Sequence, residues 1–190
     1  MSEERIKGYI EEIFGDKAYY DVKLPKITPE RVTESRKICS NNRCGNYNTS
    51  WTCPPNTGDI DECISRLESY DNAALVYDSF EVESFEMEHL NCKISDMQDL
   101  CRKVLVKARK DDMDIFVMCT GPCNYCEVCS FKKGIDCPHP EMSIPSVSGY
   151  GIPVRDMLKE IGHESKHDDK RIELFGLILY RTSDRNSMLS

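Results

Sequence analysis

The chain has 190 residues, of which 31% are charged, with a formal net charge of −8 and a sequence pI near 5.1. This length suits one domain spanning residues 1–190, and the acidity argues against a nucleic-acid partner, because no lysine and arginine stripe is present to neutralise phosphates. The apolar run 177–180, like every other apolar run of the sequence, is far too short to span a bilayer, which argues against a membrane partner. The start of the chain also lacks the pattern of a secretory signal, so we expect a cytoplasmic protein whose eleven cysteines form no disulfide framework.

Hydrophobic periodicity predicts helices that alternate with strands along the chain. Thr28 before Pro29 is typical of a helix N-cap followed by a first-turn proline. Ser95 with Gln98 three residues later is typical of a capping box, whereas 79–94 has no assignable pattern. The predicted helices are 3–14, 28–39, 59–67, 95–110 and 153–161, the predicted strands are 18–24, 73–77, 115–118 and 174–180, and 163–170 is a charged linker. This order predicts an α/β fold, an α+β sandwich in which about four strands form a mixed sheet with flanking helices and two long cysteine-rich metal-binding loops.

Residues 119–140 hold five of the eleven cysteines. Cys123, Cys126 and Cys129 are spaced C-x2-C-x2-C, and Cys137 follows with a proline directly behind it. Such close spacing brings three thiolates to one point, which suits a [4Fe-4S] cluster, as in the bacterial C-x2-C-x2-C-x3-C-P run. A single zinc ion is usually held by two separated C-x2–4-C pairs instead. The spacing therefore predicts a metal site and favours an iron–sulfur cluster over zinc.

A second group of cysteines lies in residues 39–58, a stretch rich in Asn, Gly, Ser, Thr and Pro that reads as loop. A structureless loop of this length is uncommon inside a compact domain unless it is functional or held by something. Cys39, Cys44 and Cys53 could hold it by binding a metal. These three residues predict a second metal site, whose fourth ligand the sequence does not name.

The other cysteines leave two ligand assignments open. Cys63 and Cys101 lie on the apolar stripes of predicted helices and read as core residues, and Cys92 is assigned a structural role by default. In a local assignment, Cys137 completes the site of the C-x2-C-x2-C run. In a crossed assignment, Cys137 binds the other metal and Cys119 completes the first site, as in two-cluster ferredoxins. We favour the local assignment because it recruits the fewest residues beyond the motif.

The combination of these motifs resembles a family of bacterial and archaeal predicted metal-binding proteins. The matching pieces are Cys39-x4-Cys44, Tyr47, Trp51-x-Cys53-Pro54-Pro55, Cys123-x2-Cys126-x2-Cys129, Cys137-x-His139-Pro140-Glu141, Pro145-Ser146 and Gly149-Tyr150-Gly151-Ile152. They extend from residue 39 to about residue 160. The resemblance implies metal or iron–sulfur binding through the seven cysteines of the motifs, and it implies no reaction. Because Cys119 is not part of the family motif, the resemblance weakens the crossed assignment.

Three functions fit these observations. The first is electron transfer by one or two [4Fe-4S] clusters to a redox protein partner. The second is an enzyme that uses an open iron of a three-cysteine cluster at Cys39, Cys44 and Cys53, since an open metal position can act as a Lewis acid. The third is a structural zinc-binding interaction module. The chain contains no Ser/His/Asp arrangement, P-loop or G-x-G-x-x-G motif, so we predict no catalytic residues.

Overall fold

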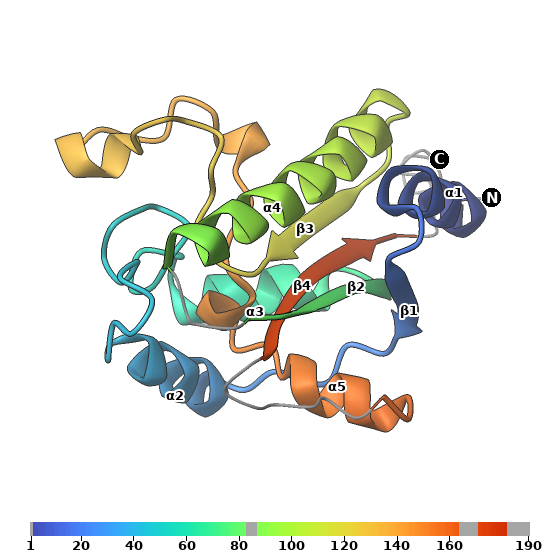
Figure 1. Cartoon of the computed structure of the whole chain (residues 1–190), viewed down its shortest axis with the longest axis horizontal. Coiled ribbons are helices and arrows are strands. Elements are labelled where there is room, and N and C mark those ends of the chain that lie inside the picture. The colour runs from blue at the N-terminus through green and yellow to red at the C-terminus, as the bar shows by residue number, and fades with distance from the viewer. Residues whose placement is uncertain (1, 83–86, 164–170, 182–190) are drawn as a thin grey trace, which may run out of the picture.

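The computed structural model describes residues 2–82, 87–163 and 171–181. Four strands form one sheet in the order β1-β2-β4-β3 (Figure 1). The strands are β1 (Ala18–Val22), β2 (Asn72–Glu81), β3 (Ile115–Cys119) and β4 (Arg171–Tyr180). All three strand pairings are antiparallel. The presence of both helices and a sheet confirms the α/β class. The prediction of a mixed sheet is wrong, because periodicity within a strand carries no information on the direction of the neighbouring strands.

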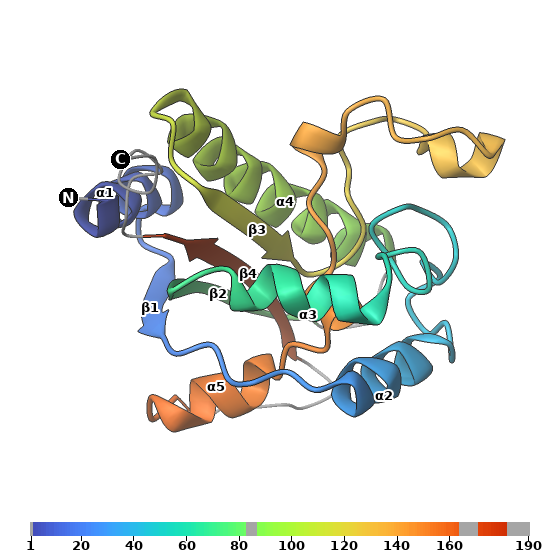
Figure 2. The same ribbon diagram turned by 180° about the vertical axis from the view of Figure 1, so that it is seen from behind.

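Helices cover both faces of the sheet (Figures 1 and 2). On one face lie α1 (Ser2–Phe14) and the long α4 (Met87–Lys110), and on the other lie α2 (Pro29–Cys39), α3 (Ile60–Glu68) and α5 (Val154–Glu160). Because successive side chains of a strand point to opposite faces, β4 sends Leu174 and Ile178 toward α1 and α4, and Leu177 and Leu179 toward the other layer. This double burial explains why β4 reads as a continuous apolar run.

The elements agree with the sequence analysis except around α4. This helix begins at Met87 rather than at Ser95, so the predicted capping box lies inside the helix. There Asn124 donates to Ser95 Oγ at 2.7 Å, and Gln98 donates to the carbonyl oxygen of Thr120 at 3.4 Å. Both polar side chains bind a distant segment instead of capping a helix. The unassigned stretch contains the end of β2 and the start of α4, and 83–86 lie outside the described residues, as do 164–170 of the predicted linker.

Two irregular segments extend from this scaffold at one end of the sheet. Residues 39–58, the first cysteine loop, connect α2 to α3. Residues 120–143, which we call the cysteine arm, leave the end of β3 and project from the body of the molecule (yellow to orange in Figure 1). The arm contains two short 3-10 helices, η1 (Ser130–Lys133) and η2 (Pro140–Met142). No described helix is long and apolar enough to cross a membrane.

Candidate metal centre

The cysteine arm brings four thiols together. The thiol of Cys137 lies close enough to Cys123, Cys126 and Cys129 to interact with each of them electrostatically, and all four are partly buried. Burial raises the pKa of the Cys137 thiol, and its three neighbours raise it further. The chain enters the arm through Gly121, where a Cβ would come within 2.5 Å of Ile94. The four residues of the predicted local site are thus neighbours in the fold.

The first cysteine loop supports the arm through two side chains that stand beside Cys53 in the sequence. Thr52 Oγ1 accepts a hydrogen bond of 2.9 Å from the backbone N–H of Cys123. Trp51 Nε1 donates to the carbonyl oxygen of Ile135 at 3.1 Å, and its ring packs edge-on against Phe131 with 5.0 Å between centroids. These contacts join the two segments that carry the two sets of thiols.

Arg102 of α4 is a further part of the arm site that the sequence analysis missed. Its side chain is only 7% exposed, and its Nη2 donates to Cys123 Sγ at 3.6 Å. Nε donates to the carbonyl oxygen of Met142 at 3.1 Å, and the guanidinium stacks over the ring of Tyr125 at 5.3 Å. Nη1 forms an ion pair with Asp99 at 2.9 Å, so the same guanidinium joins α4 to a thiol of the arm. One feature of the sequence could have indicated Arg102, because this residue directly follows Cys101, which belongs to the apolar stripe of the helix.

Cys39, Cys44 and Cys53 form the second set. They line one cavity of about 350 Å³, whose other walls include apolar side chains of α4 and β4. Burial raises the pKa of the Cys53 thiol to about 12, and burial together with the nearby Cys44 raises the pKa of the Cys39 thiol. Metal binding at this set must therefore displace protons from the thiols. Among the described residues that line the cavity, there is no fourth cysteine.

The remaining cysteines lie outside both sets. Cys101 and Cys119 are fully buried between α4 and the sheet, where their thiols are hydrogen-bonded to each other. Cys63 is also buried, and its thiol donates to the carbonyl oxygen of Thr57 at 3.3 Å. The predicted core positions of Cys63 and Cys101 are confirmed, whereas Cys92 is exposed on α4. Cys119, the residue that the crossed assignment requires, points into the core.

The donor chemistry of the two sets suits a metal or cluster that prefers sulfur. In the described ranges, no three His, Cys, Asp or Glu side chains already stand at the spacing that a single bound ion requires. Four grouped thiols are nevertheless the ligand type that both iron–sulfur clusters and structural zinc use. The arm thiols would hold such a group, and the first cysteine loop offers three further thiols around a separate cavity.

An α/β scaffold that carries two sets of thiols on two segments in contact defines a cysteine-rich metal-binding protein. The chain belongs to the family described as predicted metal-binding protein (DUF2284), whose sequence profile matches residues 26–180. The match includes all seven cysteines of the two sets and leaves out only α1, β1 and the end of the chain. No curated protein and no solved structure matches the chain. The family description supports metal binding without naming the metal.

Proposed function

We propose that the protein carries a [4Fe-4S] cluster in the cysteine arm and passes single electrons to a redox protein partner in the cytoplasm. The observation that carries this proposal is the grouping of four thiols in one projecting segment, with the buried Arg102 beside Cys123. Cys123, Cys126, Cys129 and Cys137 would hold the cluster, which supplies the one-electron chemistry. A cluster gains negative charge on reduction, so the cation of Arg102 favours the reduced form.

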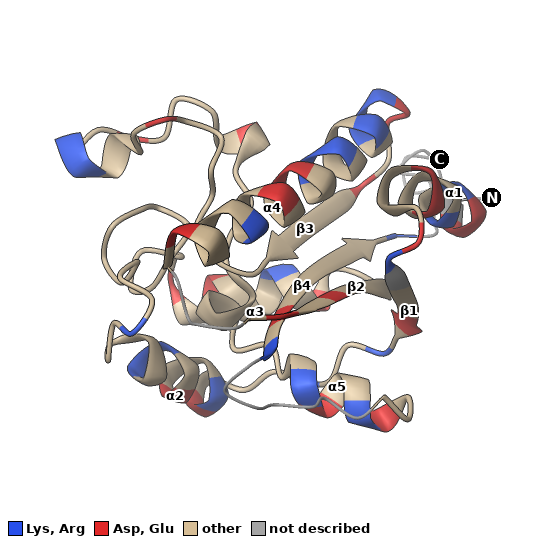
Figure 3. Cartoon of the chain, viewed as in Figure 1, with Lys and Arg blue, Asp and Glu red and all other residues tan. Residues whose placement is uncertain are grey.

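The surface of the arm supports a role in contacting a partner. Tyr125, Val128 and Ile135 are 42%, 53% and 59% exposed, and all three lie within the arm. Its tip, η1, is basic through Lys132 and Lys133, although the chain as a whole is acidic (Figure 3). Transient redox complexes form small interfaces, below about 1,200 Å² in total. Exposed apolar side chains next to the thiols offer such a contact at the shortest distance from the cluster.

A second candidate function is catalysis at the first cysteine loop. The three thiols of Cys39, Cys44 and Cys53 open on a largely apolar cavity, and the described lining adds no fourth cysteine. A cluster held by three cysteines has one iron without a protein ligand, and an open metal position can bind and polarise a substrate atom. Binding of small ligands to the reduced cluster, followed by spectroscopy, distinguishes this function, because a cluster with four protein ligands would not respond.

Metal analysis of anaerobically purified protein tests the proposed function. We expect iron and acid-labile sulfide in equal amounts and a brown colour. The Cys126→Ser variant should lose the iron and sulfide of the arm, while Cys92→Ser, which changes an exposed cysteine outside both sets, should retain them. A colourless protein with stoichiometric zinc and no sulfide would refute both iron–sulfur functions and would favour a structural zinc module.

A further inference from the structure

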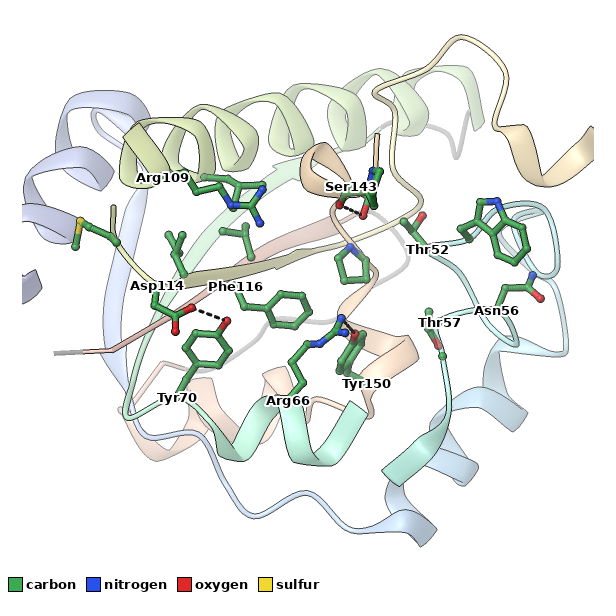
Figure 4. A pocket seen from close by; sticks show the side chains of 18 of the residues that line it. Thr52, Asn56, Thr57, Arg66, Tyr70, Arg109, Asp114, Phe116, Ser143 and Tyr150 are labelled. Atoms are coloured by element: carbon green, nitrogen blue, oxygen red, sulfur yellow. Dashed lines mark hydrogen bonds between the residues drawn. The ribbon is translucent and has the colours of Figure 1, made fainter. Parts of the chain in front are cut away.

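The open edge of the sheet borders a cavity that neither thiol set uses. β3 is an edge strand that pairs with β4 along one side. On its other side, a cavity of about 660 Å³ straddles the edge, with α4 along one wall and α3 along the opposite wall (Figure 4). The chain covers this side at Cys119, whose N–H donates to the carbonyl oxygen of Pro145 at 3.0 Å. The rest of the strand edge faces the cavity.

The backbone of β3 presents unpaired groups to this cavity. Thr120 N–H donates to the carbonyl oxygen of Phe175 at 2.8 Å, so the even-numbered residues direct their backbone groups toward β4. The odd-numbered residues must then direct theirs away from β4, as Cys119 does. The N–H and C=O groups of Ile115 and Val117 consequently face the cavity and have no hydrogen-bond partner among the described residues. Both residues are buried, and buried backbone polar groups are nearly always paired.

Two arginines extend into the cavity from opposite walls, as Figure 4 shows. Arg66 of α3 donates to Tyr150 Oη at 3.2 Å, and its guanidinium stacks over the ring of Phe116 at 5.4 Å. Arg109 of α4 donates to the carbonyl oxygen of Glu141. In the described part of the chain, no carboxylate forms an ion pair with either guanidinium. Asp112 and Asp114 also line the cavity, but because neither arginine is ion-paired within the described ranges, the part of the cavity around the two guanidinium groups favours an anionic occupant.

The acidic residues of the cavity lie at its far end, by the turn between α4 and β3. Asp114 accepts a hydrogen bond of 3.3 Å from Tyr70 Oη and lies 3.5 Å from Nη1 of Arg181. Its charge is thus balanced locally, and Asp112 is exposed at the same turn. The two arginines therefore lie along the strand edge and the two aspartates lie near its start, so the two ends of the cavity differ in charge.

We propose that this cavity binds an extended acidic peptide segment of a partner protein as a fifth strand beside β3. Adding a strand to an open sheet edge pairs the free backbone groups of Ile115 and Val117, and side-chain contacts then supply specificity. Arg66 and Arg109 would each take a carboxylate of the peptide. The chain already begins this strand position itself, because Ser146 forms an isolated parallel bridge with Cys119 before the segment turns away. The inference does not depend on which metal the thiols bind.

Titration of the full-length, ¹⁵N-labelled chain with synthetic peptides tests the proposal. The probe is a terminally blocked pentapeptide of alternating valine and glutamate. We expect its binding to shift the amide signals of Ile115 and Val117 and to slow their hydrogen exchange. The amide of Met118, which points toward β4, should change little. The binding constant comes from calorimetry on the same samples.

Substitutions and modified peptides separate backbone pairing from simple charge attraction. Arg66→Gln or Arg109→Gln should each weaken binding about tenfold, the typical effect of one charge-assisted hydrogen bond. Arg5→Gln, which removes an exposed arginine of α1 outside the cavity, should have no effect. The proposal would be overturned if a valine–lysine peptide or a backbone N-methylated probe bound as tightly as the valine–glutamate peptide. Tight binding of the N-methylated probe would indicate a site that recognises small anions rather than a strand. Absence of any shift at Ile115 and Val117 up to millimolar peptide would also overturn it.

Discussion

Replacing Cys119 and Cys137 separately by alanine distinguishes the local from the crossed assignment of the arm ligands. Cys137 interacts with the three other arm thiols, whereas Cys119 is fully buried and hydrogen-bonded to Cys101. We expect Cys137→Ala to lose the metal of the arm and to keep the fold. We expect Cys119→Ala to keep the metal and to lose stability.

The size of the stability loss follows from what each thiol contacts. Deleting one buried heavy atom of this size costs about 1 kcal/mol, and losing the hydrogen bond to Cys101 adds about 1 kcal/mol. The free energy of unfolding of Cys119→Ala should therefore fall by about 2 kcal/mol, which corresponds to roughly 4–8 °C in Tm for a chain of this length. In the metal-free protein, Cys137→Ala should change the free energy of unfolding by less than about 0.5 kcal/mol, because its side chain is partly exposed.

Two measurements on the same preparations distinguish the local from the crossed assignment. Iron, zinc and sulfide per chain, determined after anaerobic reconstitution, report the metal content of each variant. Urea unfolding of the chelator-treated proteins under reducing conditions reports the stability difference without the contribution of the metal. If Cys119→Ala lost the metal of the arm while Cys137→Ala retained it, the local assignment and the structural reasoning behind it would be refuted.

Three further substitutions test separate parts of the structure. Arg102→Met removes the cation beside the arm thiols, so the reduction potential of the arm cluster should fall by tens of millivolts and up to about 100 mV, measured by spectroscopic redox titration. The exposed Lys132→Met serves as control, and equal shifts in the two variants would contradict a specific role for Arg102. Gly176→Ala would place a Cβ 2.5 Å from Cys101 Sγ and should lower the free energy of unfolding by about 1–3 kcal/mol. Adding Cys101→Ala should recover much of this loss, and strictly additive effects in urea unfolding would disprove the clash. Burial raises the pKa of Tyr150 to about 12, above the value near 10 of an unfolded tyrosine, so its contribution to stability is complete below about pH 10 and disappears as the pH rises through 12. Unfolding free energies of the wild type should therefore fall by about 2–3 kcal/mol more than those of Tyr150→Phe over this range, and parallel curves would contradict the shift.

Most elements of the fold follow from local patterns, because burial of one face imposes a period of 3.6 residues on helices and of 2 on strands. The start of α4 was missed for a tertiary reason. Ser95 and Gln98 have the spacing of a capping box, yet both bind the cysteine arm from inside the helix. A polar residue that serves a distant contact cannot be told from a cap by its sequence neighbours. The antiparallel pairing of all strands was likewise beyond local patterns.

The two thiol sets could be predicted from spacing because each is carried by one continuous segment. Their relation to each other could not, since it depends on Thr52 reaching Cys123 and on Trp51 packing against the arm. Arg102 was missed for the same reason, because its contact with Cys123 joins residues 21 positions apart.

By itself, the amino-acid sequence determined the α/β class, the seven candidate ligands and the core positions of Cys63 and Cys101, because short-range spacing encodes all of these. The tertiary structure alone decided that Cys119 turns into the core toward Cys101, that a buried arginine stands beside Cys123, and that the edge of β3 faces a cavity into which two arginines extend. Each of these depends on segments that meet only when α4 packs on the sheet. No local pattern records which residues such packing brings together.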